Sequence, residues 1–411
     1  MLLQSERRGR GGGGTGGEPA GPTDPRPPAP GKPPLDNTTK SASARVDEST
    51  GELFPEFDPM LKWQLQAVAR LALVGHRIHV CMRHLREGKR EVQVRRSEKS
   101  SRPYYAGLMA CGSVWTCPVC APKIQAVRAL EVRSAIDQWT AQGGSVVLLT
   151  QTVPHSRHDV LEVLLGRFTD ALRRFKGRRA YTRATASYGI AGSIRGLEVT
   201  HGANGWHPHA HTILFLQGSP PPLQDAPPIL HEMKAELFRL WESAAVAAGF
   251  DQQLSSDAFD VQDASKVKNY VTKLGTEYQW NAEHELVKAH SKRGSSHSLT
   301  PFDMLRRYLD APDDGRLLAL FAEYAYTFHG KRQLVWSDGL KKRLLGTEGL
   351  TDEQVAASIG ECDEVLARIP FTDWKLIRRH NLQGHVLQVV NLYGAVGLQH
   401  LLDSYRVSFL T

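Results

Sequence analysis

The stretch SIRGLEVTHGANGWHPHAHTILFL, residues 193–216, decides the fold of this chain. Two strand-like runs flank a turn that contains Gly and Asn, which predicts a β-hairpin. His207, His209 and His211 occupy every second position, so all three project from one face of the second strand. Same-face neighbours lie about 6.6 Å apart, close enough to share an ion, whereas the first and third lie about 13 Å apart. We expect His209 and His211 to be metal ligands, with His207 as an additional ligand or a supporting group.

A carboxylate on the first strand is the third candidate ligand. A two-residue turn at 203–204 places Glu198 opposite His209, and a turn at 204–205 places it opposite His211. Either register puts the carboxylate on the histidine face, whereas a three-residue loop turns it away. A Glu/His/His set suits Mg²⁺ or Mn²⁺ acting as a Lewis acid on phosphate oxygens. The alternative is a group of surface histidines beside a turn.

The segments around the hairpin predict alternating strands and helices. GGSVVLLTQTV (143–153) is typical of a buried strand, and the segments 158–176 and 230–250 have helical periodicity. A short strand at 255–262 and a helix at 264–275 follow. The order β-α-β-β-α-β-α favours an α+β fold with a mainly antiparallel sheet and flanking helices, in a split ferredoxin-like or RNA-recognition-like layout.

Three cysteines crowd into ten positions upstream of this region. Cys111, Cys117 and Cys120 include the Cys-x2-Cys spacing of structural zinc sites. Cys81 offers a fourth Zn²⁺ ligand, with His84 as the alternate. The alternative is a set of buried free cysteines.

The chain has five cysteines, an odd number that suits metal ligation better than a disulfide framework. The fifth, Cys362, is isolated, and we expect it in the core.

The segment KVKNYVTKLG, residues 266–275, carries the candidate nucleophile. On the predicted helix, Lys266 lies four residues before Tyr270 and Lys273 three residues after it, so both ammonium groups share its face. They can hold a phosphate and favour the phenolate, the form that attacks phosphorus. A tyrosine flanked by lysines is more often structural, so this assignment depends on the histidine strand.

Together, these segments resemble the HUH endonuclease superfamily, and within it the replication initiators of rolling-circle plasmids. VVLLTQTVPH looks like the first motif of that family, GWHPHAHTILF its metal motif and YVTKL its tyrosine motif. CGSVWTCPVC, GKRQLVWSDGLKKRLLG and TDEQVAA are similar to segments of actinobacterial plasmid initiators, so the resemblance covers about residues 75–360.

The resemblance implies that Tyr270 attacks one phosphodiester of the plasmid origin. The products would be a 5′-phosphotyrosine link and a free 3′-hydroxyl for the host polymerase, with the metal held by Glu198, His209 and His211. Some members carry a glutamate four residues before the tyrosine for termination, whereas this chain has Lys266 there. Its candidate replacements are Asp263, Glu277 and Glu283.

Two alternatives remain open. A conjugative relaxase or transposase uses the same chemistry, although no helicase motif or Walker loop follows the nicking segment in this chain. A zinc-containing DNA-binding regulator with an inactive site is the alternative of another class.

The charge of the chain favours a polyanionic partner, since its formal net charge is +8 and its pI about 9.2. The basic stretch ALRRFKGRRAYTR, residues 171–183, is the best candidate for phosphate contacts. The alternative for this stretch is a solvated basic loop. The expected DNA-binding residues are Arg173, Arg174, Lys176, Arg178, Arg179, Arg183 and Lys266.

The chain divides by composition into four expected regions. Residues 1–50 are rich in Gly and Pro and predict a disordered tail. A helical and zinc-binding segment at 61–140 and the nicking domain at 141–280 follow. The region 281–411 is expected to be mainly helical, and it is a candidate for binding origin DNA, a host helicase or another copy of the chain.

No uninterrupted apolar run is long enough for a membrane span, and the N-terminal sequence has no secretory signal. We therefore expect a cytoplasmic bacterial protein without a membrane partner. Its expected partners are plasmid origin DNA, as a single strand or an extruded hairpin, with the host helicase and polymerase.

Overall fold

The structure is a computed structural model, and we describe the part of the chain that it places well. The described residues are 45–46, 53–54, 60–98, 101–218, 228–251, 253–262, 298–360 and 362–407. They belong to one unit, Ala44–Thr411. Most of the expected tail at 1–50 and the whole expected helix at 264–275 lie outside them. Within the described part, no helix combines the length and the apolar character that a membrane span requires.

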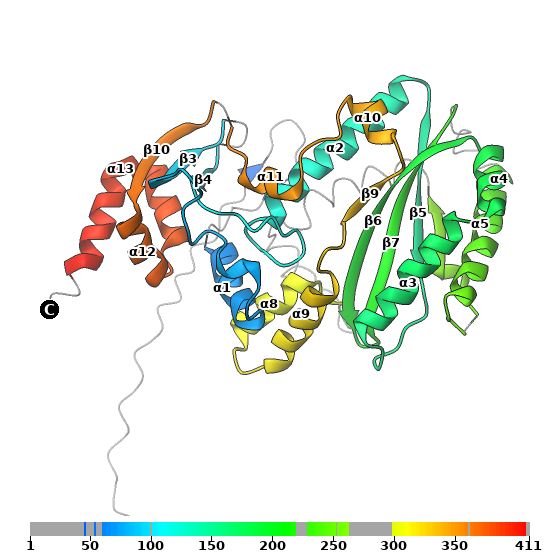
Figure 1. Ribbon diagram of the computed structural model, residues 1–411, viewed down its shortest axis with the longest axis horizontal. Helices are drawn as coiled ribbons and strands as arrows, with labels where there is room; N and C mark the ends of the chain where they lie inside the picture. The colour runs from blue at the N-terminus through cyan, green and yellow to red at the C-terminus, as the bar shows by residue number, and fades with distance from the viewer. Residues whose placement is uncertain are drawn as a thin grey trace, which may run out of the picture. The chain divides into compact units, whose positions relative to one another are not determined.

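A five-stranded sheet contains the hairpin, and neighbouring strands in it are antiparallel (Figure 1). Its strand order is β8-β5-β7-β6-β9. The strands are β5 (Ser145–Thr152), β6 (Ile190–Gly202), β7 (Gly205–Leu216), β8 (Phe259–Gln262) and β9 (Leu334–Trp336). The predicted α+β class, a mainly antiparallel sheet with flanking helices, is confirmed.

Helices α3 (Leu161–Lys176) and α5 (Pro228–Ala247) cover one face of this sheet (Figure 1). Their aromatic side chains interlock, since Trp241 makes edge contacts with Phe168 at 5.9 Å and with Phe175 at 6.0 Å between ring centroids. The strand residues that face these helices are apolar as well, so the sheet is buried on this side.

Helices α2 (Ala121–Ala141) and α10 (Leu340–Leu345) pack on the opposite face. Trp139 of α2 meets Phe215 of β7 edge-on at 5.9 Å. Because β7 alternates, Ile213 and Phe215 share this face with the preceding odd-numbered histidines. The histidines therefore lie on the α2 side of the sheet, beyond its apolar core.

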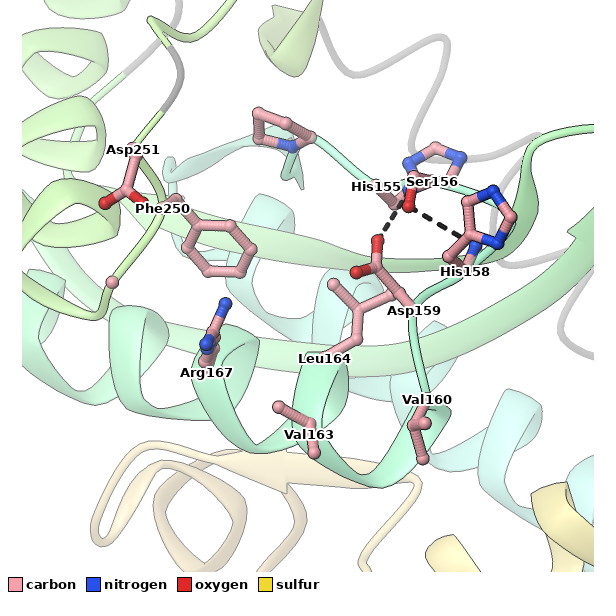
Figure 2. A pocket seen from close by; sticks show the side chains of 12 residues that line it. His155, Ser156, His158, Asp159, Val160, Val163, Leu164, Arg167, Phe250 and Asp251 are labelled. Carbon is pink, nitrogen blue, oxygen red and sulfur yellow. Dashed lines mark hydrogen bonds between the residues drawn. The ribbon is translucent and has the colours of Figure 1, made fainter.

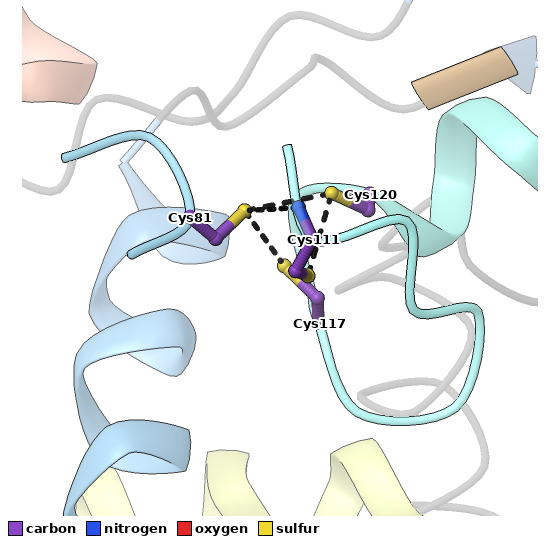
Figure 3. A group of neighbouring side chains, drawn as sticks. All are labelled: Cys81, Cys111, Cys117 and Cys120. Atoms are coloured by element: carbon purple, nitrogen blue, oxygen red, sulfur yellow. Dashed lines mark hydrogen bonds between the residues drawn. The ribbon is translucent and has the colours of Figure 1, made fainter. Parts of the chain in front are cut away.

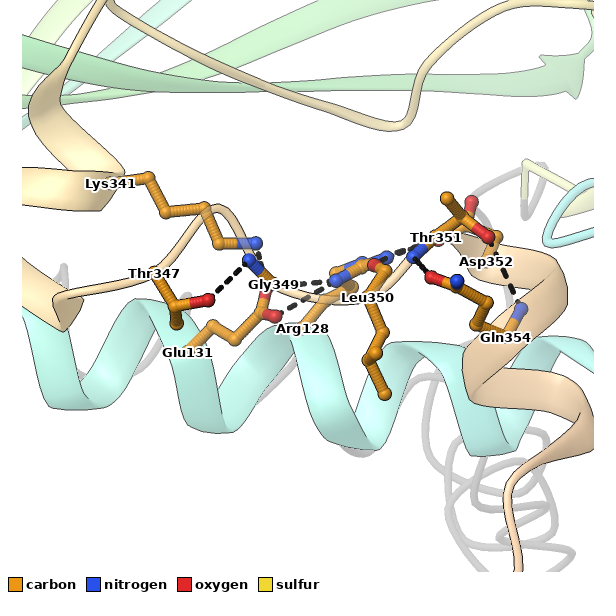
Figure 4. Close-up of polar contacts among 9 residues, drawn as sticks. All are labelled: Arg128, Glu131, Lys341, Thr347, Gly349, Leu350, Thr351, Asp352 and Gln354. Carbon is orange, nitrogen blue, oxygen red and sulfur yellow. Dashed lines mark hydrogen bonds and ion pairs between the residues drawn. The ribbon is translucent and has the colours of Figure 1, made fainter.

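A polar clasp ties α2 to the chain that follows α10 (Figure 4). Arg128 donates to Asp352 at 2.7 Å and to Glu131 at 2.9 Å, and Glu131 also accepts from Lys341 at 2.9 Å. Thr351 begins helix α11 (Asp352–Ala357) with a capping box. The clasp is half-buried, so it fixes two distant segments more firmly than an exposed ion pair would.

A second sheet of three strands has the order β10-β3-β4. Its strands are β3 (Glu91–Arg96), β4 (Pro103–Ala106) and β10 (Glu364–Pro370). Strand β10 comes from the expected helical C-terminal region, and it pairs with β3 more than 250 residues earlier in the chain. Helices α12 (Phe371–Arg379) and α13 (Gln383–Val407) share its apolar core.

Helix α1 (Leu61–Ala72) packs with α8 (Pro301–Asp310) and α9 (Gly315–Thr327), and all three share the core under α3. The short elements are β1 (Arg45–Val46), β2 (Leu53–Phe54) and the 3-10 helices η1 (Arg77–His79) and η3 (Ser256–Ala258). Cys362 is exposed, so its expected place in the core was wrong.

Candidate functional site

The hairpin has a two-residue turn at the first of the two positions that the sequence allows. Gly202 pairs with Gly205, which leaves Ala203 and Asn204 as a two-residue turn. In this register Glu198 lies directly opposite His209. The carboxylate therefore lies on the histidine face, as either two-residue turn predicts.

Glu198, His209 and His211 form one cluster of candidate ligands. Their ligand atoms all lie within 4.8 Å of one another. Oε2 of Glu198 lies 3.0 Å from Nε2 of His209 and 3.8 Å from Nε2 of His211. One carboxylate and two imidazoles converging from paired strands can hold a divalent cation.

Both imidazoles are oriented by contacts at their Nδ1 atoms. The backbone oxygen of His207 lies 3.2 Å from Nδ1 of His209, and the hydroxyl of Thr150 lies 3.0 Å from Nδ1 of His211. A carbonyl oxygen can only accept, so it favours a proton on Nδ1 of His209 and leaves the lone pair of Nε2 for a metal. Nε2 of each ring faces Glu198, so the donor set fits a cation such as Mn²⁺.

His207 does not belong to the three-residue cluster. Its ring stacks on His155 at 4.7 Å, with 24° between the planes, and lies 5.2 Å from the ring of His209. Burial, followed by the neighbouring His209 and His155, lowers the pKa of His207 to about 4. His207 is therefore neutral near pH 7 and links the cluster to the loop that follows β5.

The tip of the hairpin is held by groups far away in sequence. A side chain at Gly205 would come within 2.7 Å of the backbone oxygen of Ser156, and its φ is +83°, so only glycine fits here. Glu323 of α9 accepts from Nε1 of Trp206 at 3.0 Å and from the backbone amide of Leu161 at 2.8 Å. One carboxylate thus joins the hairpin tip to the N-terminus of α3.

The four cysteines Cys81, Cys111, Cys117 and Cys120 form the second cluster (Figure 3). Sγ of Cys81 lies 3.7 Å from that of Cys117 and 3.5 Å from that of Cys120, and the distance from Cys111 to Cys120 is 3.8 Å. Four sulfurs about 2.3 Å from a tetrahedral Zn²⁺ lie about 3.8 Å apart, so these spacings fit zinc. They are far too long for a disulfide.

The cysteine cluster is buried and receives support from α1. Nε2 of Gln66 donates to Sγ of Cys117 at 3.3 Å, and Arg70 donates to the backbone oxygen of Cys81 at 3.1 Å. Burial opposes ionisation of Cys117, but hydrogen bonds from the other three thiols bring its pKa well below the usual value. His84, the alternate ligand, is exposed and lies outside the group of four.

Comparison with known proteins matches residues 108–377 to the family described as Replication protein. The chain belongs to this replication protein family. The match spans more than half of the chain and includes both strands of the hairpin (β6 and β7) and three of the four clustered cysteines. The predicted resemblance to actinobacterial plasmid replication initiators is confirmed.

Two relatives of this replication protein come from Streptomyces. Protein rep of Streptomyces lividans is 29% identical over 339 residues, which cover 67% of this chain and 74% of that protein. A neomycin resistance protein of Streptomyces cyanogenus is 34% identical over 137 residues, which cover 27% of this chain and 31% of that protein. No solved structure matches the replication protein.

The basic stretch of the replication protein is mostly helical and not a loop, and four of its arginines are exposed to solvent. It spans the end of α3 and helix α4 (Arg179–Ser187), which follows after two residues. Arg173 and Arg174 form ion pairs with Asp170 at 2.5 and 2.6 Å.

Two further members of this stretch bond within the protein. Arg178 donates to the hydroxyl of Ser243 at 2.8 Å. Nζ of Lys176 donates to Ser193 at 2.9 Å, and burial, followed by Arg195 nearby, lowers the pKa of Lys176 to about 8. Arg179 and Arg183 are exposed on α4. These two are the best placed of the stretch for phosphate contacts.

The residues expected around the nucleophile lie outside the described part of the chain. These are Tyr270, Lys273 and Lys266, together with the candidate terminating groups Asp263, Glu277 and Glu283. Strand β8 ends at Gln262, one residue before this segment begins.

Three supporting residues were not predicted from the sequence. Thr150 lies in the first motif, and pairing of β5 with β7 would have identified it, because Thr150 faces His211 in that register. Glu323 and Gln66 act across 117 and 51 residues of sequence, to Trp206 and Cys117. No local sequence pattern indicates a contact between residues so far apart in the chain.

Proposed function

We propose that this plasmid replication initiator cuts one strand of its origin DNA by attack of Tyr270 on a phosphodiester. The cut leaves a 5′-phosphotyrosine link and a free 3′-hydroxyl, from which the host polymerase extends the strand. The membership of the replication protein family supports the role in replication. The cluster of Glu198, His209 and His211 carries the proposal of nicking chemistry.

The proposed site separates the roles of metal and protein. Glu198, His209 and His211 would hold Mg²⁺ or Mn²⁺, which would supply a Lewis acid for the scissile phosphate. The hydroxyl of Thr150 and the backbone oxygen of His207 hold the two imidazoles so that Nε2 of each remains directed at Glu198.

In the covalent step, the phosphoryl group moves from the 3′-oxygen of the DNA to the phenol oxygen of Tyr270. The phenol oxygen of Tyr270 loses its proton to solvent and forms a bond to phosphorus, while the bond from phosphorus to the 3′-oxygen breaks. The departing 3′-oxygen takes up a proton from solvent and becomes the primer hydroxyl. Lys266 and Lys273 are proposed to favour the phenolate and to hold the phosphate.

We also propose that Cys81, Cys111, Cys117 and Cys120 bind a structural Zn²⁺ ion. Their burial and their spacing of 3.5–3.8 Å support this assignment. With all four positions taken by protein sulfur, the ion stabilises the fold and has no open position for substrate.

DNA affinity is proposed to come from the basic surface of α4, chiefly Arg179 and Arg183, together with Lys266. Such phosphate contacts give binding that weakens steeply with salt and carries no base information. The described region beyond residue 300 is proposed as a further candidate for contacts with a host helicase or with a second copy of the chain.

The experiment that tests the proposal looks for the covalent adduct. Wild-type protein with a labelled single-stranded origin oligonucleotide and Mn²⁺ should give a protein-DNA band that survives denaturing electrophoresis, because a phenol that attacks phosphorus stays attached. Tyr270→Phe should bind the oligonucleotide and give no band.

Tyr278→Phe is the matched control and should still form the adduct. An adduct that persists in Tyr270→Phe and disappears in Tyr278→Phe would move the nucleophile to Tyr278. Cleavage by wild-type protein without any adduct, or binding without cleavage, would overturn the tyrosine mechanism.

A further inference from the structure

A pocket of about 400 Å³ lies at the loop that follows β5 (Figure 2). The loop between β5 and α3, the first turns of α3 and the chain after α5 form its walls. Leu164 and Phe250 are buried and make an apolar floor, whereas Val160 and Val163 line the pocket although 56% and 54% of their surface is exposed. The pocket is large enough for a small organic group.

The polar groups of the pocket stand around this apolar surface. His155 and His158 lie on one side, Asp251 lies on the opposite side, and exposed Arg167 rises from α3 near Phe250 (Figure 2). The carboxylate of Asp159 accepts from the backbone amide of Ser156 at 2.6 Å, which keeps the loop in shape. Ring faces, apolar walls and a few polar groups at the rim suit a flat heterocycle.

His155 connects the pocket to the cluster of Glu198, His209 and His211 through a chain of ring contacts. His155, which lines the pocket, stacks on His207 at 4.7 Å, and His207 lies 5.2 Å from the ligand His209. The same loop contacts the hairpin tip, where Gly205 approaches the backbone of Ser156. A strand whose phosphate lies at the metal cluster therefore has the pocket within reach of a neighbouring nucleotide.

We propose that this pocket binds one unpaired nucleobase of the origin strand next to the scissile phosphate, and that it selects a base with an exocyclic amino group. The proposal rests on the proposed nicking function, since it assigns that site a single-stranded substrate. The base stacks against His155 and the valine wall, as bases do on aromatic and apolar side chains. An unpaired base is favoured, because a base that is already out of the duplex enters a pocket without the cost of unpairing and unstacking.

Asp251 provides the selection. A carboxylate accepts hydrogen bonds only, so it favours the amino groups of cytosine, adenine or guanine and disfavours thymine, whose O4 is an acceptor. Arg167 is placed to meet the phosphate of the same nucleotide, which offsets the negative charge of Asp251. The pocket therefore adds a base contact to a site whose other proposed contacts are with phosphate.

The test places a charge in the pocket without disturbing the core. Val163→Glu projects a carboxylate from an exposed position into the pocket, and Val246→Glu is the matched control on α5, where the valine is 56% exposed and does not line the pocket. Single-stranded origin oligonucleotides, each with one abasic position near the nick, are titrated in EDTA by fluorescence anisotropy.

Wild-type protein and Val246→Glu should lose about tenfold in affinity when one particular position becomes abasic, within the range for a stacked base. Val163→Glu should bind the intact oligonucleotide about tenfold more weakly and lose little more with the abasic one. Thymine at that position should weaken wild-type binding and should be tolerated by Asp251→Asn, whose amide can also donate.

Equal affinity of Val163→Glu and Val246→Glu for every oligonucleotide would overturn the pocket, and so would the absence of any sensitive position. Indifference to thymine would overturn selection by Asp251. If Val163→Glu does not fold, Val160→Glu tests the same wall. The adduct assay separates the two proposals. If binding is sensitive to an abasic position but no adduct forms, the pocket is supported and the nicking function is overturned. If the adduct forms normally but Val163→Glu and Val246→Glu bind every oligonucleotide equally, the nicking function is supported and the pocket is overturned.

Discussion

Thr150 and His211 illustrate how a single hydroxyl can orient an imidazole of the proposed metal site. The hydroxyl of Thr150 lies 3.0 Å from Nδ1 of His211, so the ring is held with Nε2 toward Glu198. Groups that orient a ligating histidine in this way typically contribute about 10–100-fold to metal affinity. The orientation of His211 is therefore part of the proposed metal site and not only of the sheet.

We predict that Thr150→Val weakens Mn²⁺ binding by about 10-fold or more, because valine keeps the shape and removes the hydroxyl. Isothermal titration of metal-free protein with Mn²⁺ measures this. Thr182→Val, at an exposed position on α4, is the control and should bind Mn²⁺ as the wild type does. Equal affinities of the two variants would contradict the role of Thr150.

A second prediction at this scale concerns the ligands themselves. His209→Ala or His211→Ala should reduce nicking of supercoiled origin plasmid by about 100-fold or more, while duplex binding stays largely intact, because the metal serves chemistry and the basic surface serves affinity. Gel electrophoresis measures nicked circles, and anisotropy measures binding. Retained cleavage in both variants would refute the metal assignment.

At the scale of elements, Glu323 joins three segments that no local pattern connects. It accepts from the amide of Leu161, where α3 has no side-chain cap of its own, and from Trp206 at the hairpin tip. A carboxylate at a helix N-terminus also interacts favourably with the helix dipole. Helix α9 thus holds the tip of the hairpin near the N-terminus of α3.

We predict that Glu323→Ala lowers the free energy of unfolding by about 1–3 kcal/mol, since it leaves two donors without their acceptor. Urea denaturation followed by circular dichroism measures the change. Glu348→Ala, an exposed glutamate in the loop after α10, should change stability by less than about 0.5 kcal/mol. Similar midpoints for the two variants would show that Glu323 does not hold these elements.

How far the sequence predicts these elements depends on the range of the interactions. Alternation along β7 and the two-residue turn placed Glu198 among the histidines, because strand parity is a local property. Strand β9 has three residues, too few for a periodicity, and it is defined by pairing with β6 at Arg195. The same limit hid β10, whose partner β3 lies far away in sequence.

Over the whole molecule, the cysteine cluster connects segments with different roles. Cys81 follows α1 and η1, whereas Cys117 and Cys120 lead directly into α2, whose far end packs on the central sheet. The clasp around Arg128 then ties α2 to the chain after α10. Loss of the proposed zinc would therefore loosen the support of the sheet and leave the proposed metal ligands Glu198, His209 and His211 in place.

We predict that Cys117→Ser lowers the melting temperature by about 10 °C or more and removes the bound zinc, because a four-sulfur site contributes folding free energy directly. Well below the new melting temperature, the variant should still form the covalent adduct with Mn²⁺, since neither Tyr270 nor the Glu/His/His cluster is altered. Differential scanning calorimetry, elemental analysis and the adduct assay measure the three quantities. Cys362→Ser is the matched control, because Cys362 is exposed and lies outside the cluster, and it should keep both zinc and melting temperature. An unchanged melting temperature in Cys117→Ser, together with no zinc in the wild type, would show that the four cysteines are buried thiols and not a metal site.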